Sequence, residues 1–211
     1  MSVNIVHFTN GKSFTRLALW SDNLPVSQLE SMLTAENLAE YQSSMFRLAK
    51  RRMEWLKTRI LLDHLAPGAR LGFLPNGKPV LDGKVQVSVS HSAQLAAVIV
   101  SDELVGIDVQ PNEPKLQNMK TRYCNDRELK FADGPDMDDR LAMIWASKEA
   151  VFKYFGERVE FASEMQVEPF SPEDELLTLR YEGRHGQGTF KLGHLFWLEQ
   201  HVVFIRSYAI H

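Results

Sequence analysis

Two carboxylates occupy positions in this sequence where apolar side chains are expected. The first lies in the run 105–110, where valine and isoleucine alternate with Gly106, Asp108 and Gln110. This alternation predicts a strand with one apolar face that meets the core and a second face that carries Asp108. Aspartate is disfavoured inside strands and costly to bury alone, so Asp108 needs a metal ion, a basic side chain or a backbone cap as its partner. The alternative is that Asp108 ends the strand and caps the turn at Pro111.

The second carboxylate, Glu149, lies in a predicted helix at 140–155. Trp145, Glu149 and Phe152 follow one another at four- and three-residue spacing, so they share one face of that helix. The two aromatic residues predict that this face is buried, and a buried carboxylate must be paired or coordinate a metal. The alternative is an ordinary surface ion pair between Glu149 and Lys153, four residues further on.

Other candidate groups are less specific. Ser90–Ser92, with a central histidine, ends a predicted strand, but a lone histidine is more often structural and no G-x-S-x-G motif surrounds these serines. Arg52, Arg59 and Lys78 could each meet a phosphate or be solvated surface. The sequence has no P-loop, no G-x-G-x-x-G and no Cys/His cluster for zinc, which excludes the common nucleotide cradles and zinc sites.

Apolar periodicity predicts the elements that position these groups. Val3–Phe8 predicts a strand, 17–33 has no clear pattern, and helical spacing runs over 34–65 until Pro67-Gly68 ends it. Thr34 marks either the start of that helix or an earlier break. Next, an Asn-Gly pair at 76–77 predicts a tight turn, and strands at 85–90, 95–100 and 104–109 are predicted to form an antiparallel meander. The remaining predictions are a basic segment at 115–130, the helix at 140–155, and strands at 176–181, 188–192 and 201–208.

The two predicted helices resemble each other. When Trp55 is aligned with Trp145, both helices are amphipathic and both are followed by strand-rich sequence. Pro111–Pro114 interrupts the pattern between them. The sequence therefore predicts an α+β fold of two similar halves, residues 1–110 and 111–211. The alternative is chance similarity between two amphipathic helices.

Composition bounds the class of protein. The 211 residues are 44% apolar, which is ample for a packed core, and the net charge of -3 gives no bulk attraction to nucleic acid or membrane. The single Cys124 cannot form an internal disulfide, as expected in a reducing compartment. Met1–Asn10 has no signal-peptide pattern, and no stretch approaches the roughly 20 apolar residues of a membrane span. We therefore expect a cytoplasmic protein without nucleic-acid or membrane partners.

Four segments together resemble the 4′-phosphopantetheinyl transferase superfamily, specifically its longer, two-half, surfactin-synthetase-activating type. The resemblance runs from about Arg51 to Gly156, whereas the tail is similar only in its strand pattern. The arginine-rich helix 51–59 also fits. The resemblance implies two α+β halves with antiparallel sheets related by a pseudo-twofold axis, with coenzyme A (CoA) and a metal ion bound in the cleft between them. It also implies a monomer, because one chain then builds the whole cleft. The four segments are Gly77-Lys78-Pro79, Val89-Ser90-His91-Ser92, Gly106-Ile107-Asp108-Val109, and Trp145-Ala146-Ser147-Lys148-Glu149-Ala150 with Lys153.

The resemblance also implies roles for individual residues. Asp108 and Glu149 match ligands of Mg²⁺, which Mn²⁺ could replace. The family has a second acid where this chain has Gln110, whose amide oxygen can still ligate a hard cation or hold a ligating water but brings no charge. We therefore expect metal binding to survive and to be weaker. The residues that match or fit CoA-binding positions are Arg52 and Arg59 at the 3′-phosphate, Lys78 near the nucleotide, Ser90 and His91 at the phosphates, and Lys148 and Lys153 beside the pyrophosphate.

The activity implied is transfer of the phosphopantetheine arm of CoA to a serine of an acyl or peptidyl carrier protein, releasing adenosine 3′,5′-bisphosphate. Glu149 would accept the serine proton, and Lys153 with Lys148 would stabilise the leaving phosphate. The alternative, which only Gln110 supports, is a catalytically silent CoA-binding interaction protein. The carrier is expected to dock on a basic segment, which could otherwise be solvated surface. Its cations are Lys115, Lys120, Arg122, Arg127 and Lys130.

Overall fold

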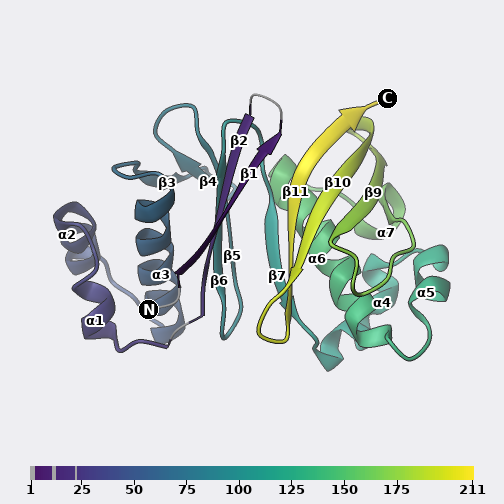
Figure 1. The fold of residues 1–211 in the computed structure, drawn as a ribbon, viewed down its shortest axis with the longest axis horizontal. Coiled ribbons are helices and arrows are strands. Elements are labelled where there is room, and N and C mark those ends of the chain that lie inside the picture. The colour runs from purple at the N-terminus through teal and green to yellow at the C-terminus, as the bar shows by residue number, and fades with distance from the viewer. Residues whose placement is uncertain (1–2, 11–12, 22) are drawn as a thin grey trace. The chain divides into compact units, whose positions relative to one another are not determined.

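The computed structural model describes residues 3–10, 13–21 and 23–211, and the chain divides into two compact units, Met1–Glu103 and Leu104–His211. Unit 1 contains a four-stranded antiparallel sheet in the order β1-β2-β6-β5, three helices and a separate two-stranded hairpin (Figure 1). Its elements are β1 (Val3–Asn10), β2 (Ser13–Trp20), α1 (Val26–Glu30), α2 (Ala35–Ser43), α3 (Ala49–Leu65), β3 (Leu71–Phe73), β4 (Pro79–Leu81), β5 (Gln86–His91) and β6 (Ala96–Ser101).

The helix predicted over 34–65 is two helices, α2 and α3. Thr34 caps α2 by accepting a hydrogen bond from the Asn37 backbone N–H at 3.2 Å. At the other end of α2, the hydroxyls of Ser43 and Ser44 both donate back to the carbonyl of Glu40, at 2.9 and 2.8 Å. Serine side chains compete with the helical backbone in this way, which accounts for the interruption before α3.

Helix α3 packs its leucine-rich face on the sheet of unit 1. Leu56, Ile60 and Leu61 belong to one buried cluster with Trp20 of β2 and Val98 of β6. The predicted turn at Asn76-Gly77 is confirmed: it joins β3 to β4, and Gly77 has a positive φ of 85° that favours glycine.

The predicted meander holds for only two of its three strands. β5 and β6 pair as expected, but β6 pairs on its other side with β2, a strand in the segment 13–20 that the sequence patterns did not predict. With both edges of β6 occupied, the strand that carries Asp108 joins the sheet of unit 2 instead. The division between the units falls after Glu103, seven residues before the predicted boundary at 110.

Unit 2 is a five-stranded antiparallel sheet in the order β7-β11-β10-β9-β8, with the long helix α6 packed on one face (Figure 1). All three strands predicted in the tail are confirmed. Residues from α6, such as Ile144 and Val151, share a buried cluster with Leu179, Phe190 and Val203 of the sheet. The elements are β7 (Ile107–Pro111), α4 (Pro114–Tyr123), α5 (Asp126–Ala132), α6 (Met137–Phe155), α7 (Phe161–Glu164), β8 (Met165–Val167), β9 (Leu176–Gly183), β10 (Gly186–Phe196) and β11 (Gln200–Ile210).

The mixed α+β class with antiparallel sheets is therefore confirmed. In each unit a long helix, α3 or α6, covers an antiparallel sheet. Among the helices of residues 3–10, 13–21 and 23–211, none is long and apolar enough to cross a membrane.

Candidate functional site

The strand β7 and the helix α6 are in close contact at the glycine that precedes the strand. A Cβ atom added to Gly106 would lie 1.9 Å from the carbonyl oxygen of Ala150, so only glycine permits this contact. The Gly106 carbonyl also accepts a hydrogen bond from the Ile205 backbone N–H at 2.9 Å. Alternation along the strand then puts Asp108 on the same face as Gly106, toward α6. The sequence assigned the core to the opposite face of this strand, whereas in unit 2 the helix covers the face that carries Asp108.

Asp108 pairs with a basic side chain from α6. The Lys153 ammonium donates to Asp108 Oδ1 at 2.7 Å and to the Ile107 carbonyl at 3.0 Å. Asp108 is 6% exposed, and the Lys153 side chain keeps a quarter of its surface accessible. The partner of Asp108 in the structure is therefore the basic side chain of Lys153. Part of this ion pair remains accessible to solvent.

Glu149 belongs to the same cluster. Burial and, next, the negative charge of Asp108 together raise the pKa of Glu149 to about 7, against the opposing effect of Lys153. The face of α6 that carries Glu149 is only partly buried: Trp145 and Phe152 contact Phe161 of α7, and Phe152 remains 38% exposed. Two carboxylates that repel each other in a partly buried setting form a donor set suited to a hard divalent cation.

Gln110 completes the polar face of β7. It is buried, and its amide nitrogen donates to the Pro111 carbonyl at 2.8 Å, which fixes the orientation of the amide. Within the part of the chain that the structure describes, no group of three or more histidine, cysteine, aspartate or glutamate side chains could hold a metal ion. The residues present therefore fit a site with two carboxylates and at most one amide oxygen.

Lys148 lies apart from this cluster, although it precedes Glu149 in sequence. Its ammonium is fully buried and forms an ion pair with Glu128 of α5 at 2.6 Å. It also donates to the carbonyls of Tyr123, Phe161 and Met165 at 2.6–2.9 Å. Burial lowers the pKa of Lys148, and the carboxylate of Glu128 opposes that shift. Lys148 thereby joins α6 to four other elements, α4, α5, α7 and β8. This position does not support the expectation that Lys148 meets a pyrophosphate.

Unit 1 contains a cavity of about 370 Å³ between the N-terminal half of α3, the β3–β4 hairpin and the end of β5. The Thr58 hydroxyl donates to the Glu54 carbonyl at 2.7 Å, so its oxygen accepts the hydrogen bond from Nε2 of His91 at 2.9 Å. His91 is thereby oriented at the wall of the cavity. The lining residues are Phe46, Arg51, Glu54, Trp55, Thr58, Arg59, Leu71, Phe73, Gly77, Pro79, Val89 and His91.

Arg59 is a buried cation in the wall of this cavity. It is 4% exposed, pairs with Glu40 at 2.7 Å and lies over the Trp55 ring, with 4.6 Å between its guanidinium carbon and the ring centroid. Its Nε is buried and has no hydrogen-bond partner among the described residues. A buried guanidinium with an unused donor beside a cavity is suited to binding an anionic group such as phosphate.

The other candidate cations and Ser90 lie around the cavity and do not line it. Arg52 instead contacts Tyr41 and pairs with Glu30 at 2.9 Å. Lys78 stands in the turn between two lining residues, and Ser90 alternates to the face of β5 opposite His91. The sequence prediction left open which arginine of the helix 51–59 contacts CoA, so it did not single out Arg51, and it did not name the lining residue Thr58. Both share the face of α3 that carries Trp55, at spacings of four and three residues, so helical periodicity could have identified them.

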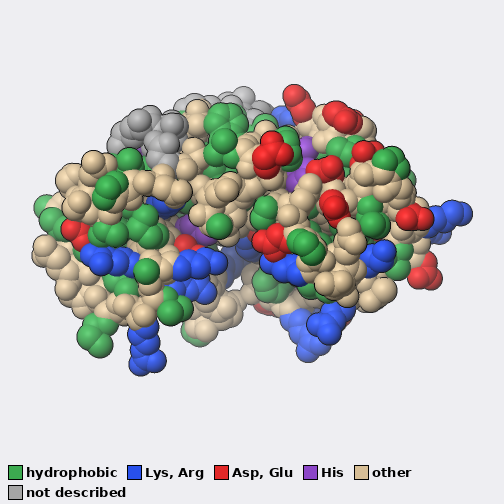
Figure 2. Space-filling view, turned by 90° about the horizontal axis from the view of Figure 1, so that it is seen from below, with side chains coloured by type: hydrophobic (Ala, Val, Ile, Leu, Met, Phe, Trp, Pro, Cys, Tyr) green, Lys and Arg blue, Asp and Glu red, His purple; other side chains and the backbone are tan. Residues whose placement is uncertain are grey.

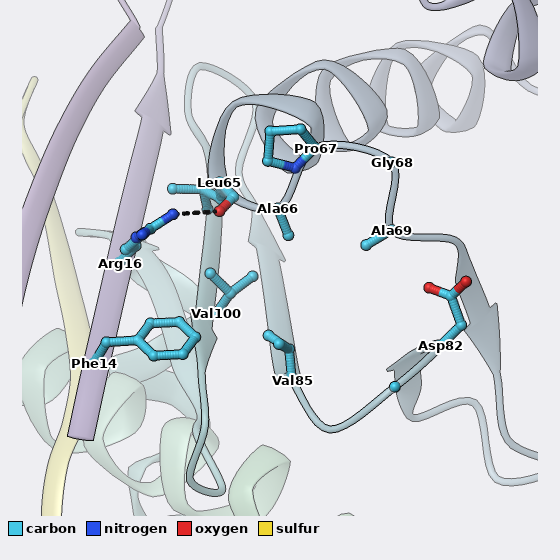
Figure 3. Close-up of a pocket in the computed structure, with 11 residues that line it drawn as sticks. Phe14, Arg16, Leu65, Ala66, Pro67, Gly68, Ala69, Asp82, Val85 and Val100 are labelled. Carbon is cyan, nitrogen blue, oxygen red and sulfur yellow. Dashed lines mark hydrogen bonds between the residues drawn. The ribbon is translucent and has the colours of Figure 1, made fainter. Parts of the chain in front are cut away.

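A second cavity of unit 1, of about 550 Å³, lies beyond the C-terminal end of α3 (Figure 3). Its walls are mainly apolar, and the guanidinium of Arg16 already donates to the Leu65 carbonyl at 3.1 Å. Figure 2 shows several basic side chains of unit 1 in the left part of the face that it displays. In unit 2, the five cations of the predicted carrier dock lie on α4 and α5; four are exposed and Lys120 is half-buried.

Comparison with known proteins agrees with the resemblance of the motifs. A family model described as the 4′-phosphopantetheinyl transferase superfamily matches residues 104–209, half of the chain and nearly the whole of unit 2. The matched segment contains Asp108, Glu149 and Lys153. No curated protein matches the chain.

Proposed function

Because the chain belongs to the 4′-phosphopantetheinyl transferase superfamily, we propose that it transfers the phosphopantetheine arm of CoA to a serine of an acyl or peptidyl carrier protein. The proposal includes the two-half, surfactin-synthetase-activating type, with units related by a pseudo-twofold axis and CoA bound by residues of both. The observation that carries it is the cluster of Asp108, Glu149 and Lys153 inside the matched segment.

Asp108 and Glu149 would hold Mg²⁺ or Mn²⁺, with Gln110 adding an amide oxygen or holding a ligating water. The support for this assignment is the mutual repulsion of the two carboxylates, which helps to raise the pKa of Glu149 to about 7. When bound, the ion supplies positive charge that neutralises and orients the pyrophosphate of CoA. Because Gln110 brings no charge, we expect weaker metal affinity than three carboxylates would give.

The residues of this cluster can move the proton that the reaction releases. The carrier serine oxygen forms a bond to the phosphorus that bears pantetheine, and the bond from that phosphorus to the bridging oxygen breaks. Adenosine 3′,5′-bisphosphate leaves with the electron pair. Glu149, whose pKa is about 7, is suited to accept the serine proton directly or through water, provided that one of its oxygens is not ligating. Lys153 would stabilise the charge that develops on the leaving phosphate.

The nucleotide end of CoA would occupy the cavity of unit 1. The support is the buried Arg59 with its unused Nε, the oriented His91, and Arg51 at the same cavity, a combination suited to the 3′-phosphate. Lys78, next to the lining residues, would contribute from the turn. Lys148 would not contact CoA, because its donors are used within the core of unit 2.

The carrier protein would approach the exposed cations of α4 and α5. Charge reversal at Arg122 and Arg127 tests this part, because loss of a complementary charge chiefly slows association and weakens carrier binding. If carrier affinity is unchanged in the doubly reversed variant, the carrier docks elsewhere.

The transferase proposal is tested by incubating the protein with CoA, Mg²⁺ and several apo carrier proteins and weighing the carriers by mass spectrometry. We expect at least one carrier to gain the mass of phosphopantetheine. Asp108→Asn and Glu149→Gln keep the shape of each side chain and should reduce the rate by at least about 100-fold. Glu182→Gln, at an exposed position of β9, is the matched control and should retain the wild-type rate.

Two outcomes would contradict the proposal. Full activity in either cluster variant would remove that residue from the site. Tight CoA binding without mass gain on any carrier would favour the catalytically silent CoA-binding protein, for which Gln110 is the supporting observation.

A further inference from the structure

The hairpin that joins β10 to β11 ends in a tight turn built from unusual residues. Trp197 and Gln200 exchange both backbone hydrogen bonds, at 2.9 and 3.1 Å, so Leu198 and Glu199 form a two-residue turn. Both central residues have positive φ, 50° and 57°, as a type I′ turn requires. Asn-Gly is the pair that suits this turn, because side chains other than those of glycine, asparagine and aspartate are strained at positive φ.

The same turn exposes three large apolar side chains in succession. Phe196 is 51% exposed, Trp197 36% and Leu198 49%. We call residues 196–198 the hairpin tip. A backbone that holds a leucine in a strained conformation and presents it to solvent gains nothing in folding stability from doing so. Outliers of this kind are retained most often where they serve recognition.

The base of the hairpin is tied to the rest of unit 2. The Phe196 ring lies 5.0 Å from the ring of His201, and Nε2 of His201 bonds to Asp139 of α6 at 3.1 Å. Asp139 also accepts from the side chain of Asn112, which lies between β7 and α4, at 2.8 Å. The hairpin tip is therefore presented on a braced support, which lowers the entropy lost on binding a partner.

Strand register places the hairpin tip near the candidate reaction centre. β11 pairs with β7 so that Val203 is opposite Asp108 and His201 is opposite Gln110. At about 3.3 Å per residue, Leu198 lies about 10 Å beyond the level of Gln110 and about 17 Å beyond that of Asp108. A stable protein complex covers roughly 800 Å² on each partner, a patch about 30 Å across. A patch of that width centred near Gln110 reaches both Asp108 and the hairpin tip, so one partner can contact the tip while it brings a serine to Asp108 and Glu149.

We propose that the hairpin tip is an apolar docking element for the carrier protein that presents the acceptor serine. This inference rests on the proposed transferase function and adds to it the surface that recognises the protein substrate. Tryptophan and phenylalanine supply much of the binding energy at protein interfaces when they fill a partner's pocket. Charges of both signs border the apolar tip: Glu199 stands in the turn itself, and Lys115, at the start of α4, pairs with Glu113. The matching partner surface is therefore an apolar pocket that accepts the exposed aromatic and leucine side chains.

The test compares steady-state transfer by wild type and two tip variants. In the first, Leu198→Asn is combined with Glu199→Gly, which removes the exposed leucine and gives the turn the residues that suit it. Because the turn is relieved of strain, this variant should unfold at the same or a higher temperature than wild type, so loss of function cannot be ascribed to misfolding. The second is Trp197→Ala. The matched control is Ile210→Ser, at the far end of β11, where the side chain is 77% exposed.

We expect the KM for the carrier to rise about 10-fold in each tip variant, as for loss of an interface anchor. The KM for CoA and the control variant should stay at wild-type values. Wild-type transfer with an unchanged carrier KM in both tip variants would overturn the docking role alone. Absence of transfer by wild type to every carrier would overturn the transferase proposal and the docking role together. A wild-type dimer that dissociates on tip substitution, with carrier KM unchanged, would assign the tip to a second copy of the chain.

Discussion

Replacing Lys148 by methionine separates a structural from a catalytic role for this lysine. The ammonium is fully buried and donates to Glu128 and to the carbonyls of Tyr123, Phe161 and Met165. Methionine fills a similar volume and supplies neither charge nor donors. The substitution therefore leaves a buried carboxylate without its counter-ion and three carbonyl oxygens without this donor.

The cost can be bounded from the remaining partners of Glu128. Removing one member of a buried ion pair typically destabilises a protein by about 3–5 kcal/mol. Glu128 keeps the backbone N–H groups of Asn125 at 2.9 Å and Val167 at 2.7 Å, which moderates the loss. The carbonyls that lose a donor add to it. We therefore expect Lys148→Met to lower the free energy of unfolding by about 4 kcal/mol.

Urea unfolding followed by circular dichroism measures this change. Adding Glu128→Gln to Lys148→Met removes the orphaned charge and should recover roughly 1–2 kcal/mol, so the two substitutions are not additive. Lys130→Met, at an exposed position of α5, is the control and should change stability by less than about 0.5 kcal/mol. The reasoning is refuted if Lys148→Met unfolds like wild type but loses transfer activity, because Lys148 would then act on the substrate.

Two further predictions follow from the packing of unit 2. Gly106→Ala should lower the free energy of unfolding by about 3 kcal/mol, because the added Cβ would meet the backbone of α6 at 1.9 Å. The control Gly72→Ala, whose added Cβ has its nearest contact at 3.7 Å, should unfold like wild type. Equal melting temperatures of the two variants would contradict this prediction. Burial, and next His194, lower the pKa of His201 from 6.5 to about 4 against the opposing pull of Asp139, so the unfolded chain binds a proton that the folded chain excludes. The contribution of His201 to stability should therefore fall by roughly 3 kcal/mol as the pH drops from about 6.5 to 4, so thermal unfolding of His201→Gln should lose that much less stability than wild type over this range; an equal change in both proteins would exclude His201 as a cause.

Local sequence patterns predicted which strands and turns form better than they predicted which strands pair with each other. The alternation at 85–90 and the Asn-Gly pair at 76–77 each specified a strand or turn that the structure contains. The same patterns placed 104–109 beside its neighbour in sequence, yet β7 pairs with β11, whose paired residues lie 89 to 97 positions further along. Periodicity describes how a strand is buried and carries no information about which strand completes its hydrogen bonds.

The sequence could predict a site residue only where its residue type is unusual for the strand or helix position that it occupies. Asp108 in an apolar strand signalled a required partner, and the structure supplies Lys153. Arg59 gave no such signal, because an arginine on a helix reads as surface until its burial against Trp55 is known. Phe196 lies outside the predicted strands 188–192 and 201–208, and only the turn geometry places it at an exposed tip.

Helix α6 supports two separate tasks because consecutive residues point about 100° apart. Glu149 and Lys153 are four residues apart and share the face toward β7, where they form the cluster with Asp108. Lys148 turns away from that face and joins α6 to Glu128 and its surroundings. Asp108 lies on β7 and Glu149 on α6, so the lysine that fixes α6 helps to position Glu149 opposite Asp108 without contacting either carboxylate. A lysine and a glutamate that are adjacent in a motif therefore need not act on the same ligand, and the Lys148→Met experiment distinguishes the two cases.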